Sequence, residues 1–132
     1  MKLEHVAFNV ENPVEMAQWY IANLGMNIVR KMDDAAYTHF IADDSGRMMI
    51  EIYNNPADKV PAYSSQDPLI LHLAFVSASP EDDKNRLIET GATYHSEFRT
   101  EEGTLLIMMR DPWGLAIQLC KRSTPMLLDK EV

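Results

Sequence analysis

The sequence predicts an α+β fold made of two tandem βαβββ modules, and three observations support this prediction. The segments LEHVAFNVENP (3–13) and ILHLAFVSASP (70–80) share the spacing of a histidine, an Ala-Phe pair and a proline. A second pair of segments, MMIEIY (48–53) and LAIQLC (115–120), also match. Both matches have the same offset of 67 residues. One register held over so much of the chain indicates an internal repeat.

A helix is predicted after the first strand of each half. Asn12-Pro13 and Ser79-Pro80 each place a capping side chain directly before a proline at the first helical position. Gly25 and Gly91 are natural stops for these helices, because glycine readily adopts the left-handed conformation that follows a helix.

Three strand-like runs follow each predicted helix. They cover 26–31, 36–42 and 47–53 in the first half and 92–99, 104–110 and 115–121 in the second. Turn residues separate the last two strands of each half, and the 67-residue offset places Asp44 opposite Asp111 there. The predicted organisation is a first module over about 1–54, a linker over 55–68, a second module over about 69–121 and a C-terminal tail over 122–132.

Composition narrows the choice of partners and compartment. The formal charge is −8, with 20 acidic and 12 basic residues. An acidic surface repels phosphate backbones and anionic lipids, so we expect neither a nucleic-acid nor a membrane partner. The single cysteine, Cys120, excludes an internal disulfide, and MKLEHVAFNV lacks the apolar run of a signal peptide. We therefore expect a soluble cytoplasmic protein.

Four polar side chains are predicted on the inner faces of otherwise apolar strands. Because side chains alternate along a strand, His5 and Glu51 lie opposite the bulky apolar residues of their strands. His72 and Gln118 hold the equivalent positions in the second half. A buried polar group costs free energy unless it is satisfied, and a divalent metal ion would satisfy all four side chains at once.

The segments LEHVAFNVENPVEMAQWYIANLGM, HLAF, IEIY and DPWGLAIQL resemble the vicinal-oxygen-chelate superfamily of glyoxalases, bleomycin resistance proteins and extradiol dioxygenases, over residues 1–121. The resemblance implies a glyoxalase-like fold, in which the modules form an open eight-stranded cup as a single domain. It implies a homodimer, and a divalent cofactor such as zinc, nickel, cobalt, manganese or iron. The first and fourth strands of each module would supply the metal ligands: His5, Glu51, His72 and Gln118.

Gln118 departs from the family pattern, which usually has a glutamate at this position. An amide oxygen can ligate a metal weakly, but it cannot accept a proton at neutral pH. Glu51 is therefore the candidate catalytic base as well as a ligand. Extradiol dioxygenases take their carboxylate from the last strand, so the resemblance does not favour dioxygenase chemistry here.

The leading hypothesis is a glyoxalase-like, metal-dependent lyase or isomerase, related to lactoylglutathione lyase, that acts on a small oxygen-chelating substrate. The alternatives are a non-catalytic, bleomycin-resistance-like protein that binds a small molecule, and a paralogue that has lost its activity. The missing second carboxylate favours these alternatives. The retained set of His5, Glu51 and His72 favours the metal-dependent enzyme.

Overall fold

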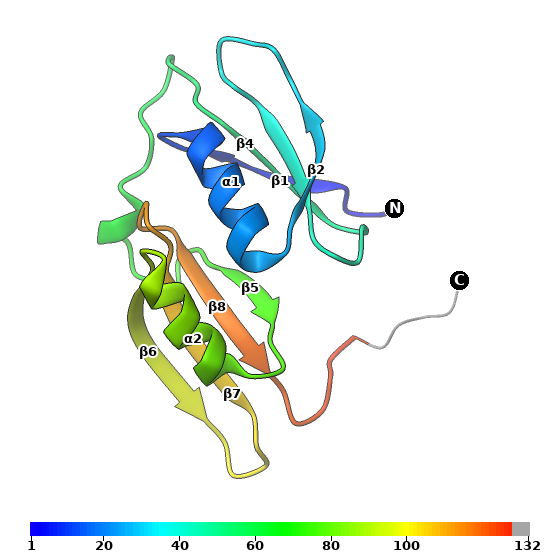
Figure 1. The fold of residues 1–132 in the computed structure, drawn as a ribbon, viewed down its shortest axis with the longest axis vertical. Helices are drawn as coiled ribbons and strands as arrows, with labels where there is room; N and C mark the ends of the chain where they lie inside the picture. The colour runs from blue at the N-terminus through cyan, green and yellow to red at the C-terminus, as the bar shows by residue number, and fades with distance from the viewer. Residues whose placement is uncertain (128–132) are drawn as a thin grey trace. The chain divides into compact units, whose positions relative to one another are not determined.

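The chain forms two βαβββ units, each a four-stranded sheet with one helix (Figure 1). The structure is a computed structural model that describes residues 1–127. Contacts within the chain separate a first unit, Met1–Pro61, from a second that begins at Ala62. The predicted α+β class with two βαβββ modules is confirmed.

The first unit has mixed strand directions. Its elements are β1 (His5–Asn9), α1 (Pro13–Leu24), β2 (Asn27–Lys31), β3 (His39–Ala42) and β4 (Met49–Tyr53). The strands lie in the order β1-β4-β3-β2, and β1 runs parallel to β4 whereas the other pairs are antiparallel. The edge strand β1 is thus hydrogen-bonded to β4.

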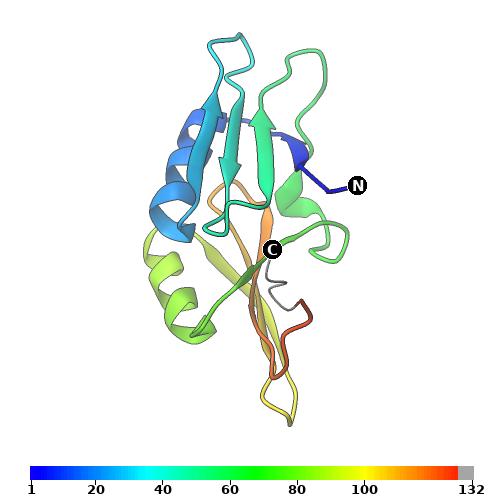
Figure 2. The same cartoon turned by 90° about the vertical axis from the view of Figure 1, so that its right-hand side faces the viewer.

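The second unit repeats this topology. Its elements are the short 3₁₀ helix η1 (Tyr63–Ser65), β5 (Leu73–Val76), α2 (Pro80–Glu89), β6 (Thr93–Arg99), β7 (Leu105–Arg110) and β8 (Ala116–Lys121). The strand order is β5-β8-β7-β6, again with one parallel pair, β5 and β8. Neither sheet closes on itself, and each helix lies along one side of its own sheet (Figure 2).

Helix α1 begins and ends where its sequence predicts. The Asn12 side chain accepts a hydrogen bond from the backbone N–H of Glu15 at 3.3 Å, and Pro13 occupies the first turn. Gly25 follows the helix in the left-handed conformation, with φ at 69°. The helix buries Met16 and Tyr20 on the side that faces β3 and β4.

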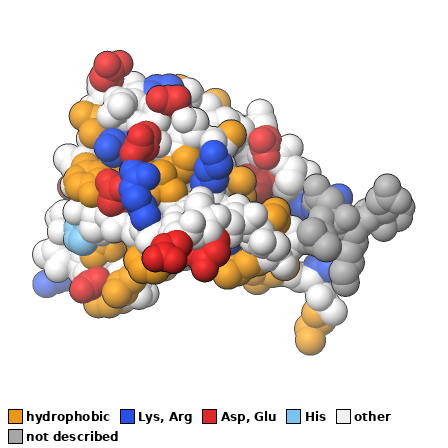
Figure 3. All heavy atoms as spheres, turned by 90° about the horizontal axis from the view of Figure 1, so that it is seen from below, with side chains coloured by type: hydrophobic (Ala, Val, Ile, Leu, Met, Phe, Trp, Pro, Cys, Tyr) orange, Lys and Arg blue, Asp and Glu red, His pale blue; other side chains and the backbone are white. Residues whose placement is uncertain are grey.

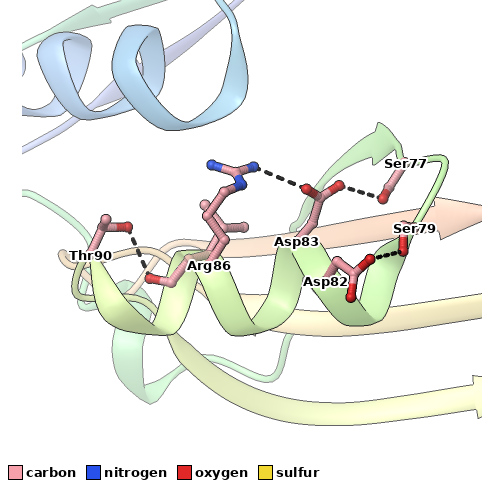
Figure 4. Close-up of polar contacts among 7 residues, drawn as sticks. Ser77, Ser79, Asp82, Asp83, Arg86 and Thr90 are labelled. Atoms are coloured by element: carbon pink, nitrogen blue, oxygen red, sulfur yellow. Dashed lines mark hydrogen bonds and ion pairs between the residues drawn. The ribbon is translucent and has the colours of Figure 1, made fainter.

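Helix α2 is held at its start by polar side chains (Figure 4). Ser77, just after β5, donates to Asp83 at 2.5 Å, and Ser79 donates to Asp82 at 2.8 Å. Asp83 also pairs with Arg86 at 3.2 Å. The acidic first turn is favourable because the N-terminal end of a helix carries partial positive charge. These contacts join the beginning of α2 to the end of β5.

The apolar core of each unit lies between its helix and one face of its sheet. In both units the two inner strands of the sheet, β3 and β4 or β7 and β8, carry most of the buried strand residues and pack against the helix. Apolar side chains also remain on the surface among charged ones (Figure 3). The fully buried core side chains include Tyr20, Met16, Ile41, Ile52, Leu87, Ile107, Met109, Leu115 and Ile117.

The register of the two sheets corrects the predicted turn equivalence. Ala42 pairs with Met49 in the first unit, whereas Arg110 pairs with Ala116 in the second, so the first turn is one residue longer. In both turns an aspartate carbonyl accepts from the glycine three residues later, Gly46 in the first turn. The counterpart of Asp111 is therefore Asp43, and the predicted match to Asp44 is wrong by one residue.

Strand β3 begins at His39 rather than at residue 36, because a turn occupies the residues before it. Asp34 accepts hydrogen bonds from the backbone N–H of Thr38 at 2.9 Å and from its hydroxyl at 2.8 Å. Tyr37 adopts a positive φ of 53°, which is incompatible with a strand. The turn therefore shortens the strand.

Part of the predicted linker is packed onto the second unit. The Arg110 guanidinium donates to the carbonyls of Tyr63 at 2.9 Å and Gln66 at 2.7 Å. Gly114, with φ at 92°, lies so close to this segment that a Cβ would meet the Cβ of Ser64 at 2.6 Å. Residues from Ala62 onward thus belong to the second unit.

The described part of the predicted tail, residues 122–127, forms no helix or strand. The rest of that tail, 128–132, lies outside the described residues. Over residues 1–127 no helix has the length and apolar character needed to cross a bilayer.

Candidate functional site

His5 and Glu51 meet on the sheet face opposite α1. His5 starts β1, and Glu51 is the central residue of β4, where its register partner is Ala7. The His5 Nε2 lies 3.6 Å from the Glu51 Oε2, and the two side chains are 35% and 21% exposed. Both are accessible enough to contact a ligand and close enough to share one.

The orientation of the His5 ring is set by two neighbours. Its Nδ1 lies 3.0 Å from the Glu4 carboxylate, which only accepts hydrogen bonds, so Nδ1 is the donor in this contact and Nε2 is the ring nitrogen left for a ligand. Phe40, the register partner of Glu51 on β3, contacts the ring edge-to-face with centroids 5.6 Å apart. The ring therefore presents its Nε2 to Glu51.

His72 precedes β5 and is oriented by a comparable contact. Its Nδ1 lies 2.8 Å from the carbonyl oxygen of Pro68. A carbonyl only accepts, so Nδ1 carries the proton and Nε2 keeps a lone pair for a ligand. Hydrogen bonding of Nδ1 to a carbonyl or carboxylate is the usual way in which proteins orient a metal-binding histidine.

Gln118 lies in the middle of β8, between Ala74 on β5 and Met108 on β7. Its Oε1 accepts a hydrogen bond from the thiol of Cys120, with sulfur and oxygen 3.2 Å apart. Burial raises the pKa of this thiol, and nearby Arg122 opposes the rise only in part, so the thiol keeps its proton at neutral pH. The amide oxygen thus already has a donor.

Each unit contributes one pair of the predicted site residues. The first unit brings His5 and Glu51 together, and the second places His72 and Gln118 in the equivalent sequence positions. Within neither unit do the described residues gather three or more His, Cys, Asp or Glu side chains suited to hold a metal ion. The four-ligand set therefore stays a prediction.

The donors present suit a divalent metal ion. Two imidazole nitrogens and a carboxylate are ligands that zinc, nickel, cobalt, manganese and iron all accept. Two ligands about 2.0–2.1 Å from one tetrahedral ion are about 3.3–3.4 Å apart. The 3.6 Å separation of His5 Nε2 and Glu51 Oε2 is close to that spacing. The first unit thus fits half of a tetrahedral site.

Sequence reasoning missed three contacts that orient these side chains. They come from Glu4, the Pro68 carbonyl and Cys120. Cys120 is detectable in the sequence, because residues two apart in a strand lie on the same face. The Pro68 contact depends on a loop conformation and has no sequence signal.

Comparisons with known proteins point to one family. A family model described as the Glyoxalase/Bleomycin resistance protein/Dioxygenase superfamily matches residues 2–119. Among curated proteins no relative matches the chain.

Solved structures share the fold. A glyoxalase family protein from Enterococcus faecalis is 25% identical with a TM-score of 0.69, covering 91% of this chain and 97% of its own. TnmS3, an antibiotic binding protein from a Streptomyces species, is 16% identical with a TM-score of 0.68, and the match covers 91% of this chain and 94% of TnmS3. A glyoxalase I mutant from Zea mays is 17% identical with a TM-score of 0.72, covering 92% of this chain and 45% of its own.

Proposed function

Because the chain belongs to the glyoxalase/bleomycin resistance protein/dioxygenase superfamily, we propose that it is a metal-dependent lyase or isomerase of the glyoxalase-like group. Its substrate would be a small molecule with two neighbouring oxygens. The observation that carries the proposal is the approach of His5 Nε2 to Glu51 Oε2 at 3.6 Å, while the other ring nitrogen, Nδ1, is engaged by Glu4.

The proposed metal ligands are His5, Glu51 and His72, with Gln118 as the fourth and weakest donor. Both histidines present Nε2, because their Nδ1 atoms are engaged by Glu4 and by the Pro68 carbonyl. Glu51 contributes the single carboxylate of the set. Gln118 has only a neutral amide oxygen, which already accepts a hydrogen bond.

A divalent ion held there would act as a Lewis acid that fixes two substrate oxygens and stabilises negative charge on them. The proposed role of Glu51 is to accept a proton from the substrate carbon and return it to the adjacent carbon. This transfer needs no oxidant or reductant. Gln118 cannot share the role, because an amide does not accept a proton at neutral pH.

A second candidate function is non-catalytic binding of a small molecule. The specific observation that favours it is Gln118, which leaves the proposed site with one carboxylate and one possible base. The fold likeness to TnmS3, which is itself an antibiotic binding protein, is consistent with this function. A binding protein would hold its ligand without turning it over.

Metal-dependent stability tests the proposal. Melting curves of the full chain with zinc, nickel, cobalt or manganese, with and without chelator, should show stabilisation of about 2.7 kcal/mol when free metal exceeds the dissociation constant a hundredfold. His72→Ala should lose most of this stabilisation. His95→Ala is the matched control, because His95 is an exposed histidine of the same unit, on β6, hydrogen-bonded to Ser96.

Three outcomes separate the candidate functions. Metal-dependent conversion of a small α-hydroxy or α-keto carbonyl compound would support the enzyme. If none of the four ions moves the melting temperature, and His72→Ala melts like the wild type, then metal-dependent catalysis is wrong. Stabilisation of the chelated protein by a small organic molecule would then support the binding protein.

The same proposal includes a homodimer that acts in the cytoplasm. The edge strands β1 and β5 carry exposed apolar side chains, with Val6 38% and Val76 95% exposed. An unpaired strand edge with apolar residues is usually covered in a stable protein. Light scattering at micromolar concentration should give twice the monomer mass, and a monomer would contradict this part of the proposal.

A further inference from the structure

Glu51 and Gln118 hold equivalent places in the two sheets, but their side chains turn in opposite directions. Glu51 is the register partner of Ala7, and Gln118 is the register partner of Ala74, in the same parallel pairing of first and fourth strands. The Glu51 carboxylate approaches His5, which lies two residues before Ala7. The Gln118 oxygen instead approaches Cys120, which lies two residues after Gln118.

These directions matter for the ligand set. Successive residues on one strand face are about 6.6–6.8 Å apart. His72 lies two residues before Ala74, so it is on one side of Gln118 along the strands, whereas Cys120 is on the other. A Gln118 oxygen that bonds to Cys120 is therefore turned away from His72. The oxygen of Glu51, by contrast, is turned toward the histidine of its own unit.

The packing around Gln118 favours this orientation. Cys120 is 8% exposed, so its thiol has few alternative acceptors in solvent. Met108, the neighbour of Gln118 on β7, is buried and provides no polar partner for the amide. A thiol at neutral pH is a donor, and Oε1 is the acceptor end of the amide.

We infer that Cys120 is a positioning residue that holds the Gln118 carbonyl out of the metal ligand set. Gln118, the fourth and weakest donor of the proposed set, is then not a ligand in the resting protein, and the proposed set is reduced to His5, Glu51 and His72. The metal in this inference rests on the proposed function, whereas the contact between Cys120 and Gln118 does not depend on it.

Two cysteine variants of the full chain separate positioning from simple packing. Cys120→Ser keeps a donor at this position, so the Gln118 side-chain amide should keep its NMR signal position in the metal-free protein. Cys120→Ala removes the donor, so that signal should move. Val76→Ala is the matched control, because Val76 is the exposed register partner of Cys120 and its side chain has no hydrogen-bond donor for the amide.

Calorimetric titration with nickel then tests the ligand set. Cys120→Ala should bind nickel severalfold more tightly than the wild type, because the released oxygen becomes a fourth ligand, and Cys120→Ser should bind like the wild type. Gln118→Ala should also bind like the wild type, because Gln118 is not a ligand in the resting protein. Thermal melts establish that each variant is folded.

The results that would overturn the inference differ from those that would overturn the proposed function. Loss of nickel affinity by more than about tenfold in Gln118→Ala would show that Gln118 is already a ligand. An unmoved amide signal in Cys120→Ala would show that the thiol does not orient Gln118. If the wild type binds no metal, the proposed function fails, and the amide signal alone decides whether Cys120 orients Gln118.

Discussion

The Nε2 of His5 lies 3.6 Å from the Oε2 of Glu51, across the parallel pair of strands β1 and β4. The two residues are 46 positions apart in the chain, and the pairing of β1 with β4 brings them together. The separation exceeds a direct hydrogen bond of about 2.7–3.2 Å, so each atom remains available to a ligand between them.

Glu51→Gln should reduce metal affinity by more than about tenfold, because it removes the only carboxylate of the proposed set. Turnover, where present, should be lost with it, since glutamine accepts no proton. Calorimetric titration with zinc measures the affinity. Glu101→Gln, in the exposed turn before β7, makes the same charge change and should leave the affinity unaltered. Equal affinity in Glu51→Gln and the wild type would remove Glu51 from the ligand set.

Gln118→Glu should tighten metal binding severalfold, because a second carboxylate adds charge and a stronger donor to the proposed site. The variant also adds a second base, so glyoxalase-like turnover should appear or increase. Titration with nickel, followed by an assay of the loaded variant, measures both effects. If the affinity falls instead, the carboxylate at this position does not face the metal.

Gly114→Ala should lower the free energy of unfolding by about 1–3 kcal/mol, because its positive φ disfavours a side chain. The added Cβ would also meet the Cβ of Ser64 at 2.6 Å. Ser64 cannot move away easily, because Arg110 donates a hydrogen bond to the carbonyl of the preceding residue, Tyr63. Gly103→Ala is the matched control, because its φ of 99° carries a similar conformational cost but nothing lies within 4 Å. Urea unfolding should show a larger loss for Gly114→Ala, and equal losses would mean that η1 moves aside without cost.

Asp34→Asn should destabilise the protein at neutral pH and much less in acid. Hydrogen bonds from the Thr38 backbone N–H and then from its hydroxyl lower the pKa of Asp34 below its ordinary value. The folded state therefore binds this proton less readily than the unfolded state, so the stabilisation is present above the unfolded pKa of about 3.9 and is lost as pH falls through the folded pKa.

Thermal melts at pH 7 and at pH 3 measure the Asp34 effect. The difference between wild type and Asp34→Asn should shrink at the lower pH. Asp33→Asn is the control, because Asp33 is the exposed neighbour in the same turn, and its difference should be small at both values. A difference for Asp34→Asn that does not depend on pH would contradict the role of its carboxylate charge.

Much of the fold could be predicted because it depends on local patterns. Asn12 caps the helix that begins at Pro13, and Pro80 begins the second helix, although the Ser79 side chain bonds to Asp82 and not to the helix backbone. Alternation along the strands put His5 and Glu51 opposite the apolar residues that face the helix. The 67-residue offset correctly related β1 to β5 and β4 to β8. Each of these features depends on neighbours within a few residues or on a repeated segment.

The sequence by itself determined the two βαβββ modules, their strand faces and the candidates His5, Glu51, His72 and Gln118. Only the tertiary structure decided that Asp43 matches Asp111, that the Glu51 carboxylate approaches His5, and that the Gln118 oxygen bonds to Cys120. Strand faces follow from alternation along one segment. Turn length between paired strands and the rotamer of a side chain depend instead on which atoms pack around them, and residues distant in sequence supply those atoms.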